Sequence, residues 1–241
     1  MQTCSSYGDL TGGCIILKVI IGDITELMIN RSAYDGYYQK LSEYRRNKAE
    51  KFKRYEDRCR SVGAGFLLEN ALKEILLVEK IPQFSLTDKG KPYLVDYPGV
   101  FFNISHSGNR VMCTVADRPV GCDVEYIETN KKTTDKIARR FFSEAEQRYL
   151  CESSTSAFYD IWTLKESFLK CTGEGLYRDM SSFSVMKICE NKYSIMGESG
   201  YSLRMLDCSD SFYRYSLCVK LDEKDADNRN YIVTDVKIFV L

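Results

Sequence analysis

The chain has 241 residues, of which 44% are hydrophobic and 28% charged, a composition that favours a packed globular protein and excludes a disordered one. Basic and acidic residues are equal in number, so the formal net charge is zero, and bulk charge gives no argument for binding nucleic acid or a membrane. The ten cysteines show no C-x-x-C spacing and there is one histidine, which argues against a Cys/His zinc site.

The amino-terminal residues lack the basic start and long apolar run of a secretory signal. The apolar run from Ile15 to Ile21 is short and contains Lys18, so it cannot span a bilayer. We therefore expect a cytoplasmic protein with reduced cysteines, most of them buried as small hydrophobic residues.

The first half of the chain predicts a strand, helices and then several strands. Cys14–Ile24 is rich in β-branched residues and predicts a buried strand. Residues 39–60 are charged and helix-favouring, and the apolar residues of Val62–Lys80 recur at helical spacing, which predicts a core helix. A turn over Thr87–Leu94 leads into an extended segment. Three short strands are expected at Phe101–Ile104, Val111–Ala116 and Val120–Ile127.

The second half repeats this order. Ser143 followed by Glu146 is a capping-box pattern that opens a helix, and a longer helix is expected over Ser156–Cys171, with Gly173 as its left-handed C-cap. Four alternating segments predict strands at Phe183–Ile188, Tyr193–Met196, Phe212–Leu221 and Tyr231–Leu241. The pattern predicts an α+β fold of two similar lobes, residues 1–118 and 119–241, with an extensive shared interface.

Two carboxylates stand out in "VGCDVEYI". Asp123 and Glu125 are two apart in a predicted strand, so both side chains project from one face. They repel each other unless a cation lies between them, and oxygen ligands of this kind suit Mg²⁺. The alternative is an edge strand with a solvated acidic face.

A second cluster lies in "IWTLKESFLK". Trp162, Glu166 and Lys170 are spaced by four and share one helix face, roughly opposite the apolar stripe. The alternative is an ordinary surface Glu–Lys pair. Trp162 is the only tryptophan, and its place among charges favours the wall of a cleft.

Two weaker signals point to anion binding. "NISHSGN" is expected to form a turn after a strand, where backbone N–H groups together with Ser105 and His106 can hold a phosphate. The alternative is a structural histidine. Lys91 precedes Pro92 and is therefore extended, which can direct its ammonium at an anion. An ordinary solvated lysine is the alternative.

Taken in order, these motifs resemble the 4′-phosphopantetheinyl transferases of the larger, Sfp-like type. The pattern W-x-x-K-E-[AS]-x-x-K is matched in full, and the resemblance extends from Leu41 to Val185. One departure is Cys122, where Ile or Val is usual; its side chain is expected to point into the core. The matching pieces are "GKP" (Gly90–Pro92), "FNISHSG" (Phe102–Gly108), "GCDVE" (Gly121–Glu125), "RRFFSEAE" (Arg139–Glu146), "WTLKESFLK" (Trp162–Lys170) and "GEGL" (Gly173–Leu176).

The resemblance implies a holo-[acyl-carrier-protein] synthase type of reaction. Coenzyme A donates its 4′-phosphopantetheine arm to a serine of an apo acyl or peptidyl carrier protein, and adenosine 3′,5′-bisphosphate leaves. The implied fold is a pseudo-twofold pair of α+β lobes. Residues 1–118 would bind coenzyme A, and residues 119–241 would supply the magnesium site and the catalytic residues.

The resemblance also implies roles for single residues. Asp123, Glu125 and Glu166 would hold Mg²⁺, with Mn²⁺ as the alternative ion, and Glu166 and Lys170 would be catalytic. Glu166, Lys170 and a metal-bound water all stay open as the base. Glu146 is either a further acidic residue near the metal or only part of the capping box. The residues expected at coenzyme A are Asp123 and Lys170, Lys91 at the nucleotide, Ser105 and His106 at its phosphates, and Arg45, Lys48 and Arg60 at the 3′-phosphate.

The carrier protein is expected to dock near Glu128–Phe142, a basic segment that suits an acidic partner; the alternative is a solvated helix with its Phe pair in the core. A monomer is expected, because two lobes of one chain can build the whole cleft.

Two other functions compete with phosphopantetheine transfer. Every position where the family resemblance implies a metal ligand or a lysine carries that residue type. This argues against a module that binds coenzyme A and the carrier protein but has lost catalysis. The full motif match argues against an unrelated magnesium-dependent phosphodiesterase.

Overall fold

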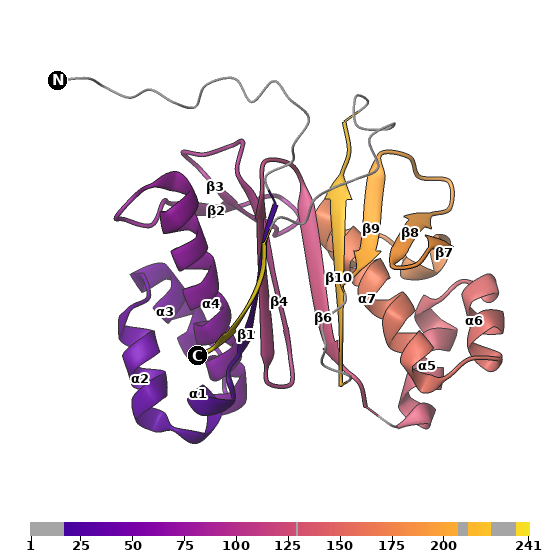
Figure 1. Ribbon diagram of the computed structural model, residues 1–241, viewed down its shortest axis with the longest axis horizontal. Coiled ribbons are helices and arrows are strands. Elements are labelled where there is room, and N and C mark those ends of the chain that lie inside the picture. Colours follow the sequence, from indigo (N-terminus) through magenta and orange to yellow (C-terminus); the bar gives the residue numbers. More distant parts are fainter. Residues whose placement is uncertain (1–16, 129, 207–211, 223–234) are drawn as a thin grey trace.

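Two β-sheets face each other in the middle of the protein, and helices cover the outer side of each (Figure 1). The computed structural model describes residues 17–128, 130–206, 212–222 and 235–241. The mixture of helices and strands confirms the predicted α+β class. No helix within these ranges is long and apolar enough to cross a membrane.

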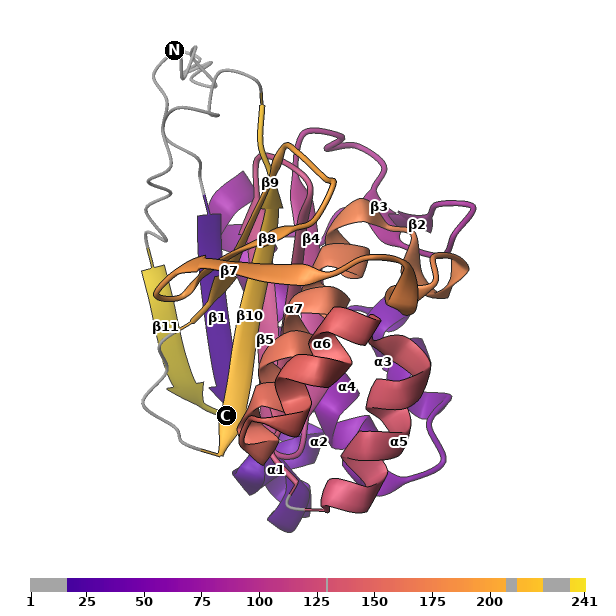
Figure 2. The ribbon, with the colours of Figure 1, turned by 90° about the vertical axis from the view of Figure 1, so that its right-hand side faces the viewer.

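The first sheet has the strand order β11-β1-β5-β4. β1 runs parallel to β11 and antiparallel to β5, and Figure 2 shows β11 beside β1. The strands are β1 (Leu17–Asp23), β4 (Phe101–Ser107), β5 (Arg110–Ala116) and β11 (Asp235–Val240). The helices between β1 and β4 are α1 (Thr25–Ile29), α2 (Arg31–Gln39), α3 (Glu43–Glu50) and α4 (Tyr55–Leu76). A separate hairpin is formed by β2 (Phe84–Leu86) and β3 (Pro92–Leu94).

The second sheet has the strand order β6-β10-β9-β8-β7. Its strands are β6 (Val120–Tyr126), β7 (Val185–Cys189), β8 (Lys192–Ile195), β9 (Tyr201–Met205) and β10 (Tyr213–Lys220). The helices are α5 (Lys131–Phe141), α6 (Glu144–Cys151) and α7 (Thr155–Thr172), followed by the 3₁₀ turns η1 (Gly175–Tyr177) and η2 (Met180–Ser182).

The cores follow from the side-chain period of two in a strand. Val19 and Ile21 point into the core between the two sheets, whereas Ile20 points the other way and packs with Leu68 and Leu72 of α4. On the far side, α7 packs on the second sheet through Leu164 and Phe168. The layers therefore run helix, sheet, sheet, helix.

Side chains of β4 join the two sheets along one line. Asn103 Oδ1 accepts from the Cys122 N–H at 3.0 Å, and the Ser105 and Ser107 hydroxyls accept from the N–H groups of Val124 at 3.3 Å and Tyr126 at 3.1 Å. These contacts place β4 directly beside β6, the strand that carries Asp123 and Glu125.

The capping box predicted at the start of α6 is confirmed. The Glu146 carboxylate also lies 2.7 Å from the ammonium of Lys165, which is fully buried and donates to the carbonyl of Phe183 at 2.5 Å. Glu146 further accepts from the Val185 N–H at 2.8 Å. The structure thus assigns Glu146 to this buried cluster between α6, α7 and β7, and not to the side chains around Asp123.

Other predicted elements differ from the structure. The strand expected at Phe101–Ile104 continues to Ser107, so Ser105 and His106 lie in β4, and the turn comes at Gly108, whose φ is +53°. The helix over Ser156–Cys171 is confirmed as α7, with Gly173 at φ +75° as its C-cap. The sequence analysis did not predict α1, α2, β2 or β9. The segments 14–16 and 231–234 of two predicted strands lie outside the described residues.

The second sheet begins at β6, two residues after the lobe boundary expected at residue 118. However, β11 pairs with β1, so the last strand of residues 119–241 belongs to the first sheet. The division into lobes and their pseudo-twofold relation stay predictions.

Candidate active site

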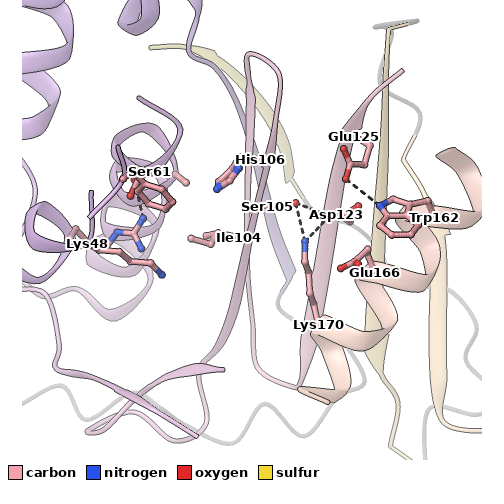
Figure 3. Close-up of a pocket in the computed structure, with 13 residues that line it drawn as sticks. Lys48, Ser61, Ile104, Ser105, His106, Asp123, Glu125, Trp162, Glu166 and Lys170 are labelled. Carbon is pink, nitrogen blue, oxygen red and sulfur yellow. Dashed lines mark hydrogen bonds and ion pairs between the residues drawn. The ribbon is translucent and has the colours of Figure 1, made fainter. Parts of the chain in front are cut away.

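A cavity of about 490 Å³ lies where β4, β6, α3, α4 and α7 meet. Figure 3 shows carboxylates and Lys170 at one end, and Lys48 and Ser61 at the other, with His106 and Ile104 between. The lining residues are Arg45, Lys48, Phe52, Ser61, Ala64, Ile104, Ser105, His106, Asp123, Glu125, Trp162, Glu166 and Lys170. The cavity thus brings together most of the site residues predicted from the sequence.

An ion pair lies at the acidic end. The Lys170 ammonium is 2.6 Å from Asp123 Oδ1 and donates to the Ser105 hydroxyl at 3.0 Å, and Ser105 donates to the same Asp123 oxygen at 2.7 Å (Figure 3). Burial raises the pKa of Asp123 although Lys170 opposes this. Burial also lowers the pKa of Lys170, but Asp123 outweighs it, so the pKa is raised and the ammonium stays charged at neutral pH.

Glu125 is held by two donors. The Ser107 hydroxyl donates to Oε2 at 2.7 Å, and the Trp162 indole N–H donates to Oε1 at 3.3 Å. Burial and the neighbouring Asp123 charge raise the pKa of Glu125 to about 7. Trp162 therefore forms a wall of the cavity, as its place on the charged face of α7 suggested.

Glu166 lies one helical turn before Lys170 and is half-buried at the cavity. Burial raises the pKa of its carboxyl, with Lys170 opposing and Asp123 adding to the shift. No residue in the described ranges donates a hydrogen bond to the carboxylate, which leaves its oxygens open to a ligand in the cavity.

Three carboxylates in one cavity fit a divalent cation in ligand type and charge, because hard oxygen ligands suit Mg²⁺ and Mn²⁺. Asp123 Oδ2 is buried and has no hydrogen-bond partner in the described part of the chain, so this oxygen has a lone pair to offer to a cation. In the present arrangement Lys170 occupies Asp123 Oδ1, and no group of three or more His, Cys, Asp or Glu residues among those described is placed to hold a metal ion. A full set of ligands therefore requires side-chain movement.

The opposite end of the cavity is cationic. The Arg45 guanidinium is buried and donates to the Ser61 carbonyl at 3.0 Å, while its Nε has no partner within the described residues. Burial lowers the pKa of both Arg45 and Lys48, and Arg45 lowers that of Lys48 further. Two crowded and partly buried cations at one end of a cavity favour an anionic ligand.

The structure separates the roles of Ser105 and His106. Both residues pair with β5 as part of a ladder, so the prediction that they lie in a turn is wrong, whereas their binding of a phosphate stays a prediction. The buried Ser105 hydroxyl is engaged by Asp123 and Lys170. The His106 side chain is open to the cavity, where its partial enclosure and then the Lys170 and Arg60 cations lower its pKa. Of the two, His106 is the one available to a ligand.

Lys91 and Arg60 do not line the cavity. The Lys91 ammonium donates to the carbonyls of Val120, Lys170 and Cys171 at 3.2, 2.6 and 3.0 Å. The Arg60 guanidinium donates to the Gly108 carbonyl at 2.9 Å and lies 2.6 Å from the Asp57 carboxylate. The structure thus gives Lys91 and Arg60 partners within the fold, and their contacts with coenzyme A stay predictions.

We expect Lys91→Met to destabilise the protein by about 1–3 kcal/mol, because three carbonyls lose a charged donor, while the KM for coenzyme A changes little. Thermal unfolding and steady-state kinetics measure the two effects. Lys89→Met, at an exposed lysine two residues away, is the control. A large rise in KM with unchanged stability would restore Lys91 to the ligand contacts.

Sequence reasoning missed Phe52, Ser61, Ala64 and Ile104 as lining residues, and Ser107 as the partner of Glu125. A signal for Ser107 exists: Asn103, Ser105 and Ser107 alternate in "NISHS", so a strand places all three on one face. The other four are ordinary core or helix residues by type, and only the packing of α3 and α4 brings them to the cavity.

The three similar proteins compared below are each described as a 4′-phosphopantetheinyl transferase. Residues 119–232 match the model of the 4′-phosphopantetheinyl transferase superfamily. A 4′-phosphopantetheinyl transferase of Bacillus subtilis is 31% identical over 205 residues, which cover 83% of this chain and 90% of that protein. The 4′-phosphopantetheinyl transferase Sfp of Bacillus subtilis (strain 168) is 33% identical over 181 residues, 73% of this chain and 80% of Sfp. The 4′-phosphopantetheinyl transferase gsp of Aneurinibacillus migulanus is 36% identical over 167 residues, 66% of this chain and 67% of gsp.

Proposed function

Because this chain belongs to the 4′-phosphopantetheinyl transferase superfamily, which moves 4′-phosphopantetheine from coenzyme A to carrier proteins, we propose that the cavity described above is where the transfer takes place. The observation that carries this proposal is the division of one cavity into a cationic end and an end with three carboxylates and Lys170. Coenzyme A has a 3′-phosphate apart from its pyrophosphate, so such a division matches its two anionic groups.

Arg45 and Lys48 bind the 3′-phosphate in this proposal, and His106, which lies between the two ends of the cavity, contacts a phosphate of the coenzyme. The support is the buried Arg45 Nε without a partner and the lowered pKa values of both cations. An anion beside these two cations would offset the cost of burying their charge.

Asp123, Glu125 and Glu166 are the proposed ligands of Mg²⁺ or Mn²⁺. When bound, the ion supplies positive charge that stabilises the pyrophosphate oxygens during phosphoryl transfer. Trp162 and Ser107 orient Glu125 through their hydrogen bonds, and Ser105 holds Asp123 beside Lys170.

In the transfer step, the carrier serine oxygen bonds to the phosphorus that bears the pantetheine, and the bond from that phosphorus to the bridging oxygen breaks. Glu166 accepts the serine proton, since its carboxylate has a raised pKa and open oxygens. Lys170 keeps its proton because Asp123 raises its pKa, so it acts as a fixed cation at the reacting phosphate. Adenosine 3′,5′-bisphosphate leaves.

One assay tests this function. The protein is incubated with coenzyme A, Mg²⁺ and an apo carrier protein, and the carrier is weighed by mass spectrometry. We expect a gain of one phosphopantetheine group. The absence of any gain across fatty-acid, polyketide and nonribosomal-peptide carriers would support an inactive binding module, and hydrolysis of coenzyme A without transfer would support a phosphodiesterase.

We expect His106→Ala to raise the KM for coenzyme A by roughly tenfold while kcat changes little, because a hydrogen bond to a charged ligand contributes about 1.5–3 kcal/mol. Steady-state kinetics at saturating carrier separates the two constants. His106→Gln keeps a donor and should recover part of the affinity. A fall in kcat with unchanged KM would make His106 part of the chemical step instead.

The carrier protein is proposed to dock on α5. This helix presents the exposed residues Lys132, Lys136, Arg139 and Arg140, and Phe141 at its end packs edge-on against Trp162 of the cavity wall, with ring centroids 5.8 Å apart. Phe142 is 1% exposed and stacks on Phe158. This residue therefore belongs to the core, as the alternative interpretation of the segment expected for its Phe pair. A basic surface beside the cavity suits an acidic carrier.

We expect Lys136→Glu with Arg139→Glu to raise the KM for the carrier by roughly tenfold or more, because like charges then face each other across the interface, with the KM for coenzyme A unchanged. The effect should shrink at high salt. Lys187→Glu with Lys192→Glu, on β7 and β8 of the same half of the chain, is the matched control. Equal effects of both pairs would place the docking surface elsewhere.

The cavity is lined by residues from both sheets and both helical layers of one chain, so we propose that a monomer is active. We also propose a cytoplasmic location, which suits the seven free cysteines of the described residues. Light scattering during turnover and localisation of a tagged protein test the two statements.

A further inference from the structure

Two cysteines lie in the core cluster where α7 packs on the second sheet. Cys171 is near the end of α7 and Cys218 lies in β10, and both belong to the apolar core cluster between this helix and the second sheet. Both are free thiols, and the Cys171 thiol donates to the Pro119 carbonyl at 3.3 Å. The transfer reaction uses neither of them.

Backbone packing explains why the thiols meet. Cys218 is the cross-strand partner of Gly121, and a Cβ built on Gly121 would overlap the backbone nitrogen of Cys171. The backbone of Cys171 therefore rests on Gly121, directly beside Cys218. This close approach of helix and strand makes the two cysteines neighbours, which is the first requirement of a disulfide.

The surroundings make the two thiols unequal. The neighbouring Cys218 thiol lowers the pKa of Cys171, and the Lys91 ammonium acts in the same direction. Burial raises the pKa of Cys218. A thiol with more thiolate character is the better nucleophile towards an oxidant, so Cys171 is the first of the two to react.

A small oxidant has a route to Cys171. Although only 2% of this residue is exposed, it lines a second cavity of about 270 Å³, together with Lys91, Tyr97, Phe101 and Pro119. Cys218 does not line this cavity. Of the two cysteines, Cys171 is thus the one that borders the cavity, and Cys218 lies behind it, an order that suits an attacking and a resolving cysteine.

We propose that Cys171 and Cys218 are a redox-sensitive pair that closes into a disulfide when the protein meets a hydroperoxide. The Cys171 thiolate attacks the terminal peroxide oxygen, the O–O bond breaks, and the leaving hydroxide or alkoxide takes a proton, which gives a sulfenic acid and water or an alcohol. The Cys218 sulfur then attacks the Cys171 sulfur and releases water. Two thiols are oxidised and one peroxide is reduced.

Disulfide formation bears on the active site through the chain itself. Bonded sulfurs are about 2.0 Å apart, so we expect the last turn of α7 to shift towards β10 when the disulfide forms. Lys170 immediately precedes Cys171 in this turn, and the carbonyls of both residues accept from the Lys91 ammonium. A displaced catalytic group can cost up to roughly 100-fold in rate, so we expect the disulfide to slow transfer by roughly tenfold or more.

Peptide mapping tests the pair without reference to the activity. The full-length reduced protein is treated with hydrogen peroxide, its remaining thiols are alkylated, and its peptides are analysed by mass spectrometry. We expect a peptide pair linked through Cys171 and Cys218 that dithiothreitol releases. Cys218→Ser should trap the sulfenic acid, detected as a dimedone adduct on Cys171. Cys113→Ser, at a buried thiol of β5, should leave the link intact.

A wild-type protein that forms no such link, or a dimedone adduct on another cysteine in Cys218→Ser, would overturn the pair. The transfer rate is followed in parallel: the oxidised wild type should slow and recover with dithiothreitol, whereas Cys218→Ala should resist this reversible loss. A link that leaves the rate unchanged overturns the coupling to Lys170. Because the mapping needs no turnover, failure of the proposed transfer reaction would be seen separately.

Discussion

Glu166→Gln is expected to lower the rate of phosphopantetheine transfer by roughly 100-fold or more, because the amide can neither accept the serine proton nor bind a cation as a charged ligand. The fold should survive, since no hydrogen bond from another described residue depends on this carboxylate and the side chain faces the cavity. Single-turnover transfer to an apo carrier measures the chemical step, and thermal unfolding checks the fold.

The matched control is Glu79→Gln, which makes the same chemical change at an exposed position and should leave the rate unaltered. Titration with Mg²⁺ separates the two proposed roles of Glu166. A base alone would lose rate at every Mg²⁺ concentration, whereas a metal ligand would also need more Mg²⁺ to reach its maximum. Near-normal turnover in Glu166→Gln would remove this residue from the mechanism.

The sequence predicts those parts of the site whose residues lie together on one helix or one strand. Glu166 and Lys170 share a helix face through their spacing of four, and Asp123 and Glu125 share a strand face through their spacing of two. The cavity contains all four. Local periodicity therefore suffices for each pair, and the family resemblance brings the two pairs together.

The contacts that cross between elements could not be predicted in this way. Lys91 is separated from Lys170 by 79 positions, yet its ammonium donates to the Lys170 carbonyl. Ser105 turns out to hold the ion pair of Asp123 and Lys170, because β4 continues past the expected turn and brings its hydroxyl to β6. The partner of a polar side chain depends on the tertiary packing, so residue type and spacing identified both positions but not the contacts that they make within the fold.

The same packing makes the position of α7 depend on one residue of β6. Asp123 is fixed in the strand and Lys170 in the helix, and their ion pair requires the two backbones to approach closely. The sequence "GCDVE" permits this approach because its first residue has no side chain on the face that α7 covers. The glycine of this motif is therefore a determinant of active-site geometry two residues away from the first carboxylate.

Gly121→Ala is expected to lower stability by about 1–3 kcal/mol, as overpacked sites do, and to reduce the transfer rate by roughly 100-fold, as the displacement of catalytic groups by about 1 Å can. The new methyl group would overlap the Ser167 carbonyl oxygen and the Cys171 nitrogen and lie 2.9 Å from the carbonyl carbon of Lys170. These are backbone atoms, so α7 must move as a unit and carry Glu166 and Lys170 away from Asp123.

Gly36→Ala in α2 is the control, because no described atom comes within 4 Å of the methyl group that this residue would gain. The protein should then gain roughly 0.5–1 kcal/mol of stability. Thermal unfolding and transfer kinetics report both effects, and a stable, fully active Gly121→Ala would show that α7 does not need this contact to hold its catalytic residues in place.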